Sequence, residues 1–228
     1  MEKLQGSYKN KGGRVGAAVV AASLMASGGQ AAVDYGGFEQ PLDKMQIVKS
    51  IMSGLIGEVE GETWGKDTKG ILTSPYGINA RDHAELLEEL RIQNNVAKIK
   101  DIPKEHLKEA ALGIFGRMGD EYAVGNRGVT PAEWRTLSGE GQFVVTSATF
   151  NTGDPYPNLT KALIKYESNP TLPNLSAAVK QTWRRGGTGA QKGADNRAVK
   201  DLIAAGFIDL SKPEHRKILK KHLNKYSL

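Results

Sequence analysis

Three residues, Glu58, Asp67 and Thr73, lie close together in the sequence, and the two carboxyls among them could cut a glycosidic bond. Hydrolysis of such a bond needs one carboxylic acid to protonate the leaving oxygen, and one ionised carboxylate to steer water or the sugar cation. Glu58 lies three residues after Leu55 and seven after Ile51, on the apolar side of a predicted helix and at its C-terminal end. Burial and the negative end of the helix dipole both favour a protonated carboxyl there.

Asp67 is expected in a different environment from Glu58. It occupies a polar turn between Lys66 and Lys69, whose positive charges favour the ionised carboxylate. Two carboxyls whose surroundings push their protonation states apart are what an acid–base hydrolase requires. Taken alone, three alternating glutamates at 58, 60 and 62 would usually form a solvated helix face. The assignment of Glu58 as the acid therefore rests on its spacing from the residues of the hairpin.

The elements that must hold these groups follow from periodicity. Apolar residues recur at steps of three and four over residues 45–56, which predicts a helix that ends within 57–61. Turn residues and β-formers over 65–77 predict a small hairpin. The rest of the chain is predicted to be helical, so the expected fold class is α+β, mainly α.

The later helices have recognisable starts. Thr130-Pro131-Ala132-Glu133 is a capping box with proline at the first helical position, and residues 211–214 repeat that pattern before a basic tail helix. Besides the helix that begins at the capping box, the predicted spans are 80–99, 103–117, 140–151, 159–167, 175–184, 196–205 and 215–226.

Composition narrows the function classes. With no cysteine among 228 residues, disulfides, thiolate zinc sites and cysteine nucleophiles are excluded. The four histidines form no i, i+4 pair and have no acidic companion at ligand spacing, so neither a metal nor another cofactor is expected. A net charge of +6 favours an anionic partner: nucleic acid, a membrane surface or a cell-wall polymer.

The first 44 residues differ from the rest. A basic start precedes residues 15–33, which carry no charge and are rich in glycine, alanine and serine. This pattern is typical of a secretory signal, and its length also permits transient membrane contact, although a buried small-residue helix or a flexible arm fits equally well. The expected organisation is a head and linker at 1–44, a catalytic domain at 45–206 and a basic C-terminal helix at 207–228.

The spacing of Glu58, Asp67 and Thr73 resembles the signature of the phage lysozymes, the muramidase group with a lysozyme-like fold. That signature is a glutamate at the end of the first helix, an aspartate after eight intervening residues and a threonine after five more. Two later segments agree in order. Residues 147–153 (SATFNTG) resemble the family's Phe-Asn-x-Gly segment, and Trp183 with Asn196-Arg197-Ala198 resembles its closing motifs.

This resemblance implies a two-lobed domain with a small hairpin and a helical C-terminal lobe. It implies cleavage of the β-1,4 bond between N-acetylmuramic acid and N-acetylglucosamine in peptidoglycan. Glu58 would be the acid, and Asp67 with Thr73 would position the attacking water for hydrolysis with inversion. Phage lysis, or delivery of phage DNA by a virion-borne enzyme, would be the setting.

Phe150, Asn151 and Arg197 are the substrate-binding residues that the resemblance implies, with Arg197 also expected to form ion pairs that order the second lobe. The chain departs from the family in two places. The hairpin lacks the family's closing histidine, and the glycine that usually follows the catalytic glutamate here follows Glu60, as Gly61. Glu60 is therefore a rival for the acid, although the register of the hairpin favours Glu58.

The expected partner is the peptidoglycan glycan strand. The enzyme is expected to be a phage-encoded monomer that acts in the bacterial periplasm or cell wall. The enzyme would be exported by its N-terminal membrane-type segment or carried in the virion. One alternative is a lytic transglycosylase acting on the same bond, which needs the glutamate but no water-holding pair. Another is a non-enzymatic virion or nucleic-acid-binding protein on a lysozyme-like scaffold, although few aromatics interleave with the basic residues and no specific nucleic acid is expected.

Overall fold

A computed structural model of the chain describes residues 42–228, apart from 68–69, 183–187, 224–225 and 227–228. The side chains at 42–43, 45–46, 58–59 and 188–191 also lie outside this description. Of the sequence-based predictions, the segment 15–33 and Trp183 therefore fall outside the described residues. Within them the protein is mainly helical with one two-stranded antiparallel sheet, which confirms the predicted α+β, mainly α class.

The helices and strands follow one another along the chain in the order that the periodicity predicts. The helices are α2 (Leu42–Glu60), α3 (Ala84–Gln93), α4 (Lys104–Ala123), α5 (Pro131–Thr136), α6 (Gly139–Thr152), α7 (Pro157–Ser168), α8 (Leu172–Lys180), α9 (Thr188–Ala204) and α10 (Pro213–His222). The strands are β1 (Gly65–Lys66) and β2 (Leu72–Thr73), with 3-10 turns η1 (Pro75–Gly77) and η2 (Ile99–Asp101). The predicted hairpin is thus confirmed, with Gly65 opposite Thr73 and Lys66 opposite Leu72.

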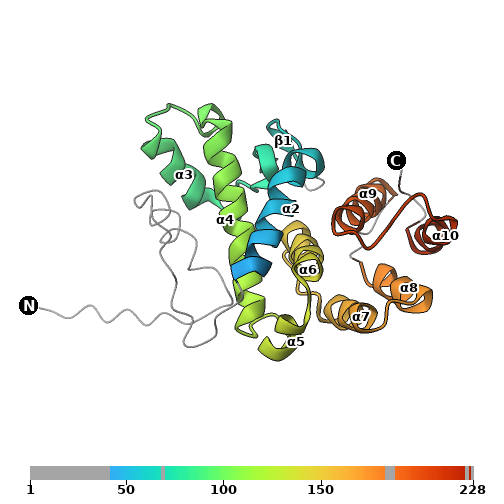
Figure 1. Ribbon diagram of the computed structural model, residues 1–228. Coiled ribbons are helices and arrows are strands. Elements are labelled where there is room, and N and C mark those ends of the chain that lie inside the picture. The colour runs from blue at the N-terminus through green and yellow to red at the C-terminus, as the bar shows by residue number, and fades with distance from the viewer. Residues whose placement is uncertain (1–41, 68–69, 183–187, 224–225, 227–228) are drawn as a thin grey trace, which may run out of the picture.

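Two long helices, α2 and α4, run side by side and connect the two ends of the molecule (Figure 1). We call β1, β2, η1 and α3 the hairpin end, and α5 to α10 the helical end. At the hairpin end, η1 packs against both α2 and α4. At the helical end, α7, α8 and α10 pack in succession, and α9 lies against α6 and α2.

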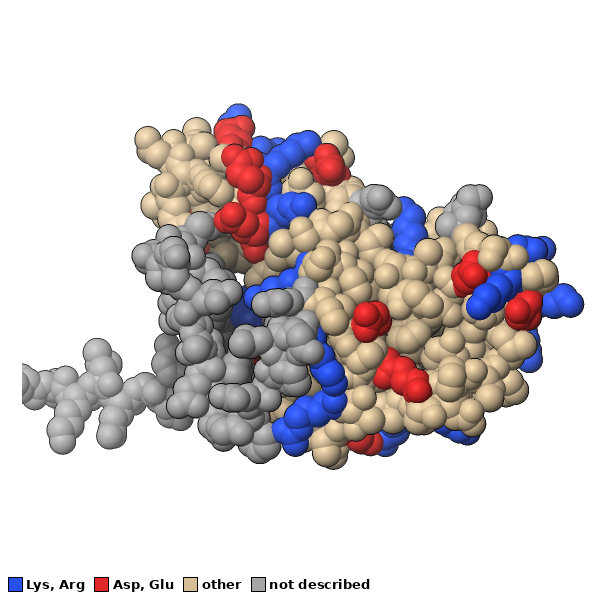
Figure 2. Space-filling model, viewed as in Figure 1, with Lys and Arg blue, Asp and Glu red and all other residues tan. Residues whose placement is uncertain are grey.

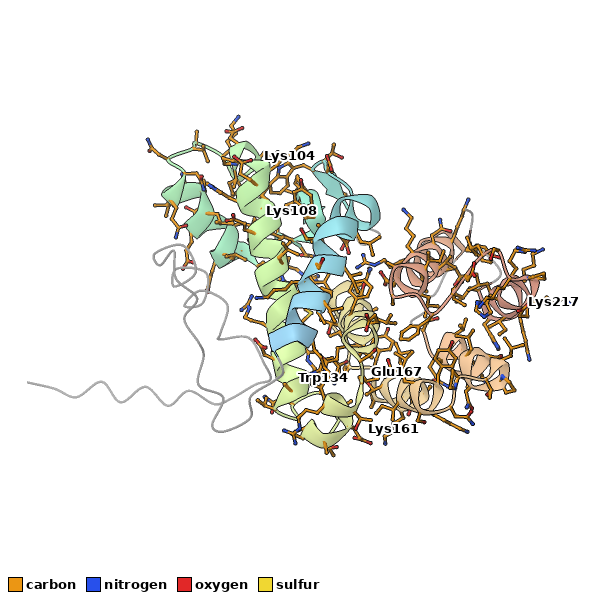
Figure 3. All side chains as sticks on the ribbon, in the orientation of Figure 1. Lys104, Lys108, Trp134, Lys161, Glu167 and Lys217 are labelled. Atoms are coloured by element: carbon orange, nitrogen blue, oxygen red, sulfur yellow. The ribbon has the colours of Figure 1, made fainter. Side chains whose placement is uncertain are left out.

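Helix α6 is the centre of the helical end. Gly139 and every residue from Gly141 to Thr149 are buried, in keeping with a helix that packs against α2, α4, α7 and α9 on different sides. At its start, the Ser138 side chain accepts a hydrogen bond from the Gly141 N–H. Glu167 of α7, labelled in Figure 3, in turn accepts hydrogen bonds from the Ser138 N–H and hydroxyl. The start of α6 is therefore held by the Ser138 side chain and, through it, by α7.

Helix α2 ends within the predicted interval, at a position that matters for the site. The helix continues through Glu60 and stops at Gly61, whose φ of +81° is in the left-handed region that glycine adopts readily. The Gly61 N–H donates to the Gly57 carbonyl at 3.0 Å, which closes the last turn. Gly57 therefore does not interrupt the helix, and both Glu58 and Glu60 belong to its final turn.

One of the two predicted capping boxes is confirmed and the other is wrong. Thr130 and Glu133 cap α5 reciprocally, as predicted. Before α10, however, the N-cap is Lys212 and no side chain caps the helix. Ser211 is engaged elsewhere, because its N–H and hydroxyl both donate to Asp209 Oδ1. A local turn has therefore displaced the cap that the motif predicts.

Replacing the two candidate caps should separate them by stability. We expect Thr130→Ala to lower the free energy of unfolding by about 1 kcal/mol, because an N-cap hydroxyl is lost. Ser211→Ala should cost clearly less, since that hydroxyl satisfies no helix N–H. Urea denaturation of both variants measures the difference, and an equal or larger loss for Ser211→Ala would contradict the assignment of caps.

Candidate functional site

The end of α2 brings one of the predicted acids into contact with the helical end. Glu60 is largely buried, with 15% of its side chain exposed, and its carboxylate forms an ion pair with Arg197 of α9. Glu58 lies in the same last turn of α2, and its side chain is outside the described residues. The prediction of Glu58 as the acid therefore stays a prediction, while its rival Glu60 has defined partners.

Arg197 is the centre of a buried polar cluster, which we call the Arg197 cluster: Glu60, Ser147, Arg197 and Asp201. The Arg197 side chain is 4% exposed. Its Nε donates to Asp201 Oδ1 at 3.0 Å and Oδ2 at 3.1 Å, and its Nη2 donates to Ser147 Oγ at 2.6 Å. Its Nη1 donates to Glu60 Oε1. Three helices, α2, α6 and α9, thus meet through one guanidinium.

Ser147 holds the cluster together from α6. Its hydroxyl donates to Asp201 Oδ2 at 2.8 Å while its oxygen accepts from Arg197. Because a hydroxyl can donate once and accept twice, a single buried serine satisfies both charged neighbours. Removing any one member would leave a buried polar group unpaired, which is costly away from water.

The electrostatics of the Arg197 cluster keep its cation charged. Burial works against the charge of Arg197, but Asp201 and Glu60 outweigh it and raise the pKa of the guanidinium. Burial also raises the pKa of Asp201, against the opposing effects of Arg197 and Ser147. With one cation and two carboxyls, the cluster would carry one net negative charge if both carboxyls were ionised.

The hairpin end approaches the same carboxylate. Gly77 of η1 has φ +85°, and a Cβ placed there would lie 2.7 Å from Glu60 Oε2. The adjacent Tyr76 N–H donates to the Gly61 carbonyl at 3.0 Å, which ties η1 to the end of α2. Glu60 therefore lies where the hairpin end and the helical end meet.

Asp67 and Thr73 are brought together by the hairpin. Asp67 Oδ1 accepts from the Ile71 N–H at 2.9 Å, and the Thr73 hydroxyl donates to the Ile71 carbonyl at 3.2 Å. Both side chains thus contact the backbone of one residue. Asp67 Oδ2 also accepts from Asn79 Nδ2 at 3.3 Å, so each carboxyl oxygen of Asp67 has an N–H donor.

Phe150 and Asn151 lie at the C-terminal end of α6, and both are half-buried. The Phe150 ring packs against Phe115 of α4, with the ring centroids 5.9 Å apart. Asn151 follows Ser147 by four residues, so the two lie on the same face of α6. This spacing places the predicted glycan-contact segment one turn from the Arg197 cluster.

None of the protein-family models, curated proteins or solved structures compared with this chain matches it. The site is therefore argued from its own geometry. Within the described part of the chain, no helix is both long enough and apolar enough to cross a membrane. In the same residues, no three histidine, aspartate or glutamate side chains gather as metal ligands.

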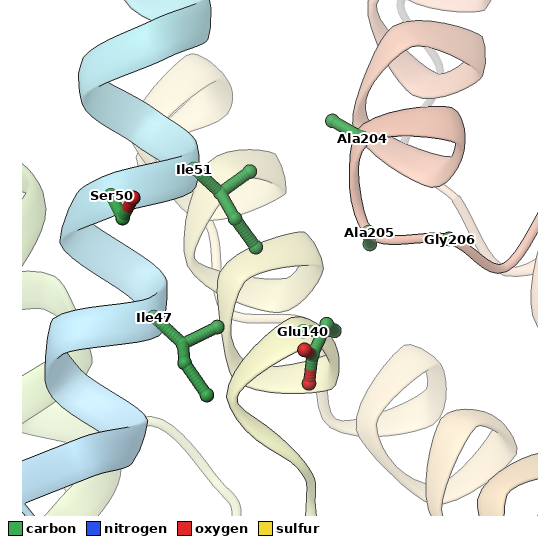
Figure 4. A pocket seen from close by; sticks show the side chains of 7 residues that line it. All are labelled: Ile47, Ser50, Ile51, Glu140, Ala204, Ala205 and Gly206. Atoms are coloured by element: carbon green, nitrogen blue, oxygen red, sulfur yellow. The ribbon is translucent and has the colours of Figure 1, made fainter.

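A separate pocket lies farther back along α2 (Figure 4). It is lined by residues of α2, the start of α6, and the end of α9 with the two residues that follow it: Ile47, Ser50, Ile51, Glu140, Ala204, Ala205 and Gly206. Ile51 precedes Glu60 by more than two helical turns, roughly 14 Å along the axis. Glu140 is the one titratable side chain among these lining residues, so this pocket does not provide two carboxyls.

The surface gives no single preferred anion-binding face in the view of Figure 2. Acidic and basic side chains lie intermixed there over the α3–α4 region and again over α10. The Lys104 ammonium lies 3.8 Å from the Glu62 carboxylate. Arg91 likewise forms an ion pair with Glu88 within α3. The net positive charge is therefore distributed rather than concentrated on this face.

Two members of the Arg197 cluster were not singled out from the sequence. Asp201 had a usable signal, because it follows Arg197 by four residues and such a pair faces the same side of a helix. For Ser147 the sequence signal is its place in the segment 147–153. The glycine directly after Glu60 was the signal that favoured this glutamate over Glu58.

Two glycine substitutions should reveal how tightly η1 closes on Glu60. Gly77→Ala and Gly70→Ala both force alanine into the left-handed region, at about 1–2 kcal/mol each. We expect Gly77→Ala to lower the free energy of unfolding by a further 1–3 kcal/mol or so, because the new methyl displaces the Glu60 carboxylate from Arg197.

Gly70 is a matched control for this comparison. It has φ +75° and open space around the added Cβ. Urea unfolding of both variants gives the difference directly. Equal losses would show that η1 does not confine the Glu60 side chain.

Proposed function

We propose that the protein is a peptidoglycan hydrolase that cleaves the β-1,4 bond between N-acetylmuramic acid and N-acetylglucosamine, on a lysozyme-like two-lobed fold. One observation carries the proposal. A largely buried glutamate, Glu60, is held by Arg197 of the helical end. It also lies against the segment that follows the hairpin bearing Asp67 and Thr73. Glycoside hydrolysis requires this kind of pairing of two different carboxyl environments.

Glu60 is the acid in this proposal. Its carboxyl is largely buried, its position is set by Arg197 and Gly77, and Gly61 follows it directly. The spacing to the hairpin favours Glu58 instead, and that sequence-based prediction is tested below. Glu62 is exposed and lies near Lys104, which suits a surface role.

Each side chain has a role in the proposed reaction. Glu60 protonates the glycosidic oxygen as the bond to the leaving sugar breaks. Asp67 accepts a proton from the attacking water, whose oxygen forms the new bond on the opposite face of the sugar. Because the Thr73 hydroxyl donates to the Ile71 carbonyl, its oxygen lone pairs remain to accept the second hydrogen of that water. The product would have inverted configuration.

Phe150 and Asn151 would contact the glycan next to this centre. An aromatic ring edge and an amide at the end of α6 suit the apolar face and the polar groups of a sugar. The net charge of +6 suits an anionic wall. A phage origin and action in the periplasm or cell wall, after export or virion delivery, belong to the same proposal.

Glutamine substitutions at the three neighbouring glutamates identify the acid. We expect Glu60→Gln to lower the release of muropeptides from purified cell wall by about 10²–10⁴-fold, since a general acid is lost. The amide still accepts a hydrogen bond from Arg197, so the thermal unfolding temperature should change little. Glu62→Gln is the matched control, and it should retain wild-type activity.

Glu58→Gln completes this series. We expect it to keep most of the activity. If Glu58→Gln is inactive and Glu60→Gln is active, the sequence-based assignment is correct and Glu60 is not the acid. If the wild-type protein releases no muropeptides from any wall, the proposed function itself is wrong.

The products distinguish hydrolysis from transglycosylation. We expect wild-type muropeptides to carry the mass of one added water in mass spectrometry. Asp67→Asn should lower their release by roughly 10²-fold or more, because the base that activates water is lost. Anhydro-sugar ends together with an active Asp67→Asn variant would instead identify a lytic transglycosylase.

A further inference from the structure

We propose that Asp201 is a positioning residue that offsets the charge of Arg197, so that Glu60 can carry the proton it donates. This inference rests on the proposed function, because it assigns the partner that lets Glu60 act as an acid. It stands on the geometry of the Arg197 cluster, in which two carboxyls share one buried guanidinium.

The two carboxyls take different edges of Arg197. Asp201 binds Nε with both of its oxygens, and Ser147 anchors it further through a hydrogen bond at 2.8 Å. Glu60 accepts a hydrogen bond from Nη1 alone, through one oxygen. Asp201 is 3% exposed and Glu60 15%, so Asp201 is the more enclosed partner and Glu60 the one nearer to solvent.

The number of charges explains why both carboxyls are needed. A guanidinium facing a single buried carboxyl would hold that carboxyl ionised, because an opposite charge within about 4–6 Å favours the charged form. An ionised Glu60 could not protonate a leaving group. Asp201 binds the Nε edge with both oxygens and so shares the charge of Arg197, which weakens the hold of that charge on Glu60 while the position of Glu60 is kept.

The remaining charged groups around Glu60 do not supply this offset. From η1, Glu60 meets Gly77, which has no charge. From α6 it has the neutral Ser147 within the cluster, and on α4 Lys104 lies near Glu62 instead. On its own helix, Glu58 is the nearest carboxyl in sequence, and on α9 Asp195 is a further buried one. Asp201 is the carboxyl that binds Arg197 together with Glu60.

A purely structural Asp201 would predict a different result from the one expected here. Loss of a structural ion pair would lower stability and the overall rate at every pH. Loss of a charge offset shifts the pH at which the acid loses its proton, and this appears on the alkaline side of the kcat/KM profile. The two carboxyls also share one cation, so they should titrate as a coupled pair.

The test compares four forms of the full chain: wild type, Asp201→Asn, Ser147→Ala and the double variant Arg197→Gln/Asp201→Asn. Wall cleavage is measured across pH, with folding checked by circular dichroism. In Asp201→Asn, Arg197 faces Glu60 alone and the acid is deprotonated at lower pH. We expect the alkaline limb to move down by about one to three pH units. The double variant removes both charges, so its limb should return toward that of the wild type.

Ser147→Ala is the matched control, because it removes hydrogen bonds from the same cluster but no charge. It removes one hydrogen bond to the Asp201 carboxylate but leaves its charge in place, so we expect it to move the alkaline limb clearly less than Asp201→Asn does. An unmoved limb in folded Asp201→Asn overturns the proposal, and so does a limb that moves equally in Ser147→Ala. Either result would leave Asp201 with a structural role only.

A second measurement needs neither variant nor activity. Carboxyl carbon NMR of the labelled wild-type protein follows Glu60 and Asp201 through a pH titration. Signals that shift together over the same pH range support the shared guanidinium, and independent titrations overturn it. If the wild type cleaves no wall, the proposed function fails, while this titration still decides whether Asp201 and Glu60 are linked.

Discussion

The ion pair between Glu60 and Arg197 is the interaction on which the arrangement of the site depends. It joins residues 137 positions apart in the chain and connects the end of α2 to α9. Leaving Arg197 buried without either of its carboxyl partners would typically cost about 3–5 kcal/mol. The chain must therefore supply every member of the cluster together: a helix that extends through Glu60, a serine on α6 and a second carboxylate on α9.

Helix α6 shows how a core element can also serve a polar site. It is buried along most of its length, yet it carries several polar side chains. Three of them form hydrogen bonds locally or across a helix: Thr146 donates to the Gln142 carbonyl, the Thr149 hydroxyl bonds to the Tyr122 hydroxyl, and Ser147 donates to Asp201. Satisfied buried networks of this kind specify one packing arrangement, because alternatives leave polar atoms unpaired. Arg197 is thereby hydrogen-bonded to a side chain of a closely packed core helix.

The sequence predicts those features whose cause is local. Helical periodicity, the hairpin and the Thr130 capping box depend on residues a few positions apart, and they are found as predicted. Ser211 was assigned wrongly because its motif does not show that Asp209 competes for the same hydroxyl. The contact between Glu60 and Arg197 is not predictable from local pattern, since it depends on how α9 packs against α2. Asp201 was accessible through its i, i+4 spacing only once Arg197 was known to be buried.

The choice between Glu58 and Glu60 illustrates the limit of spacing as an argument. Positions 58 and 60 lie about 200° apart around the α2 axis, so they cannot present the same face to α9. Counting from the hairpin selects position 58, whereas packing against α9 selects position 60. The link between Asp67 and Thr73 through Ile71 is internal to the hairpin and holds for either choice. The contacts of Asp67 and Thr73 are thus set within the hairpin, whereas the partners of Glu60 are set by helix packing, which is why each proposed role must be tested by its own substitution.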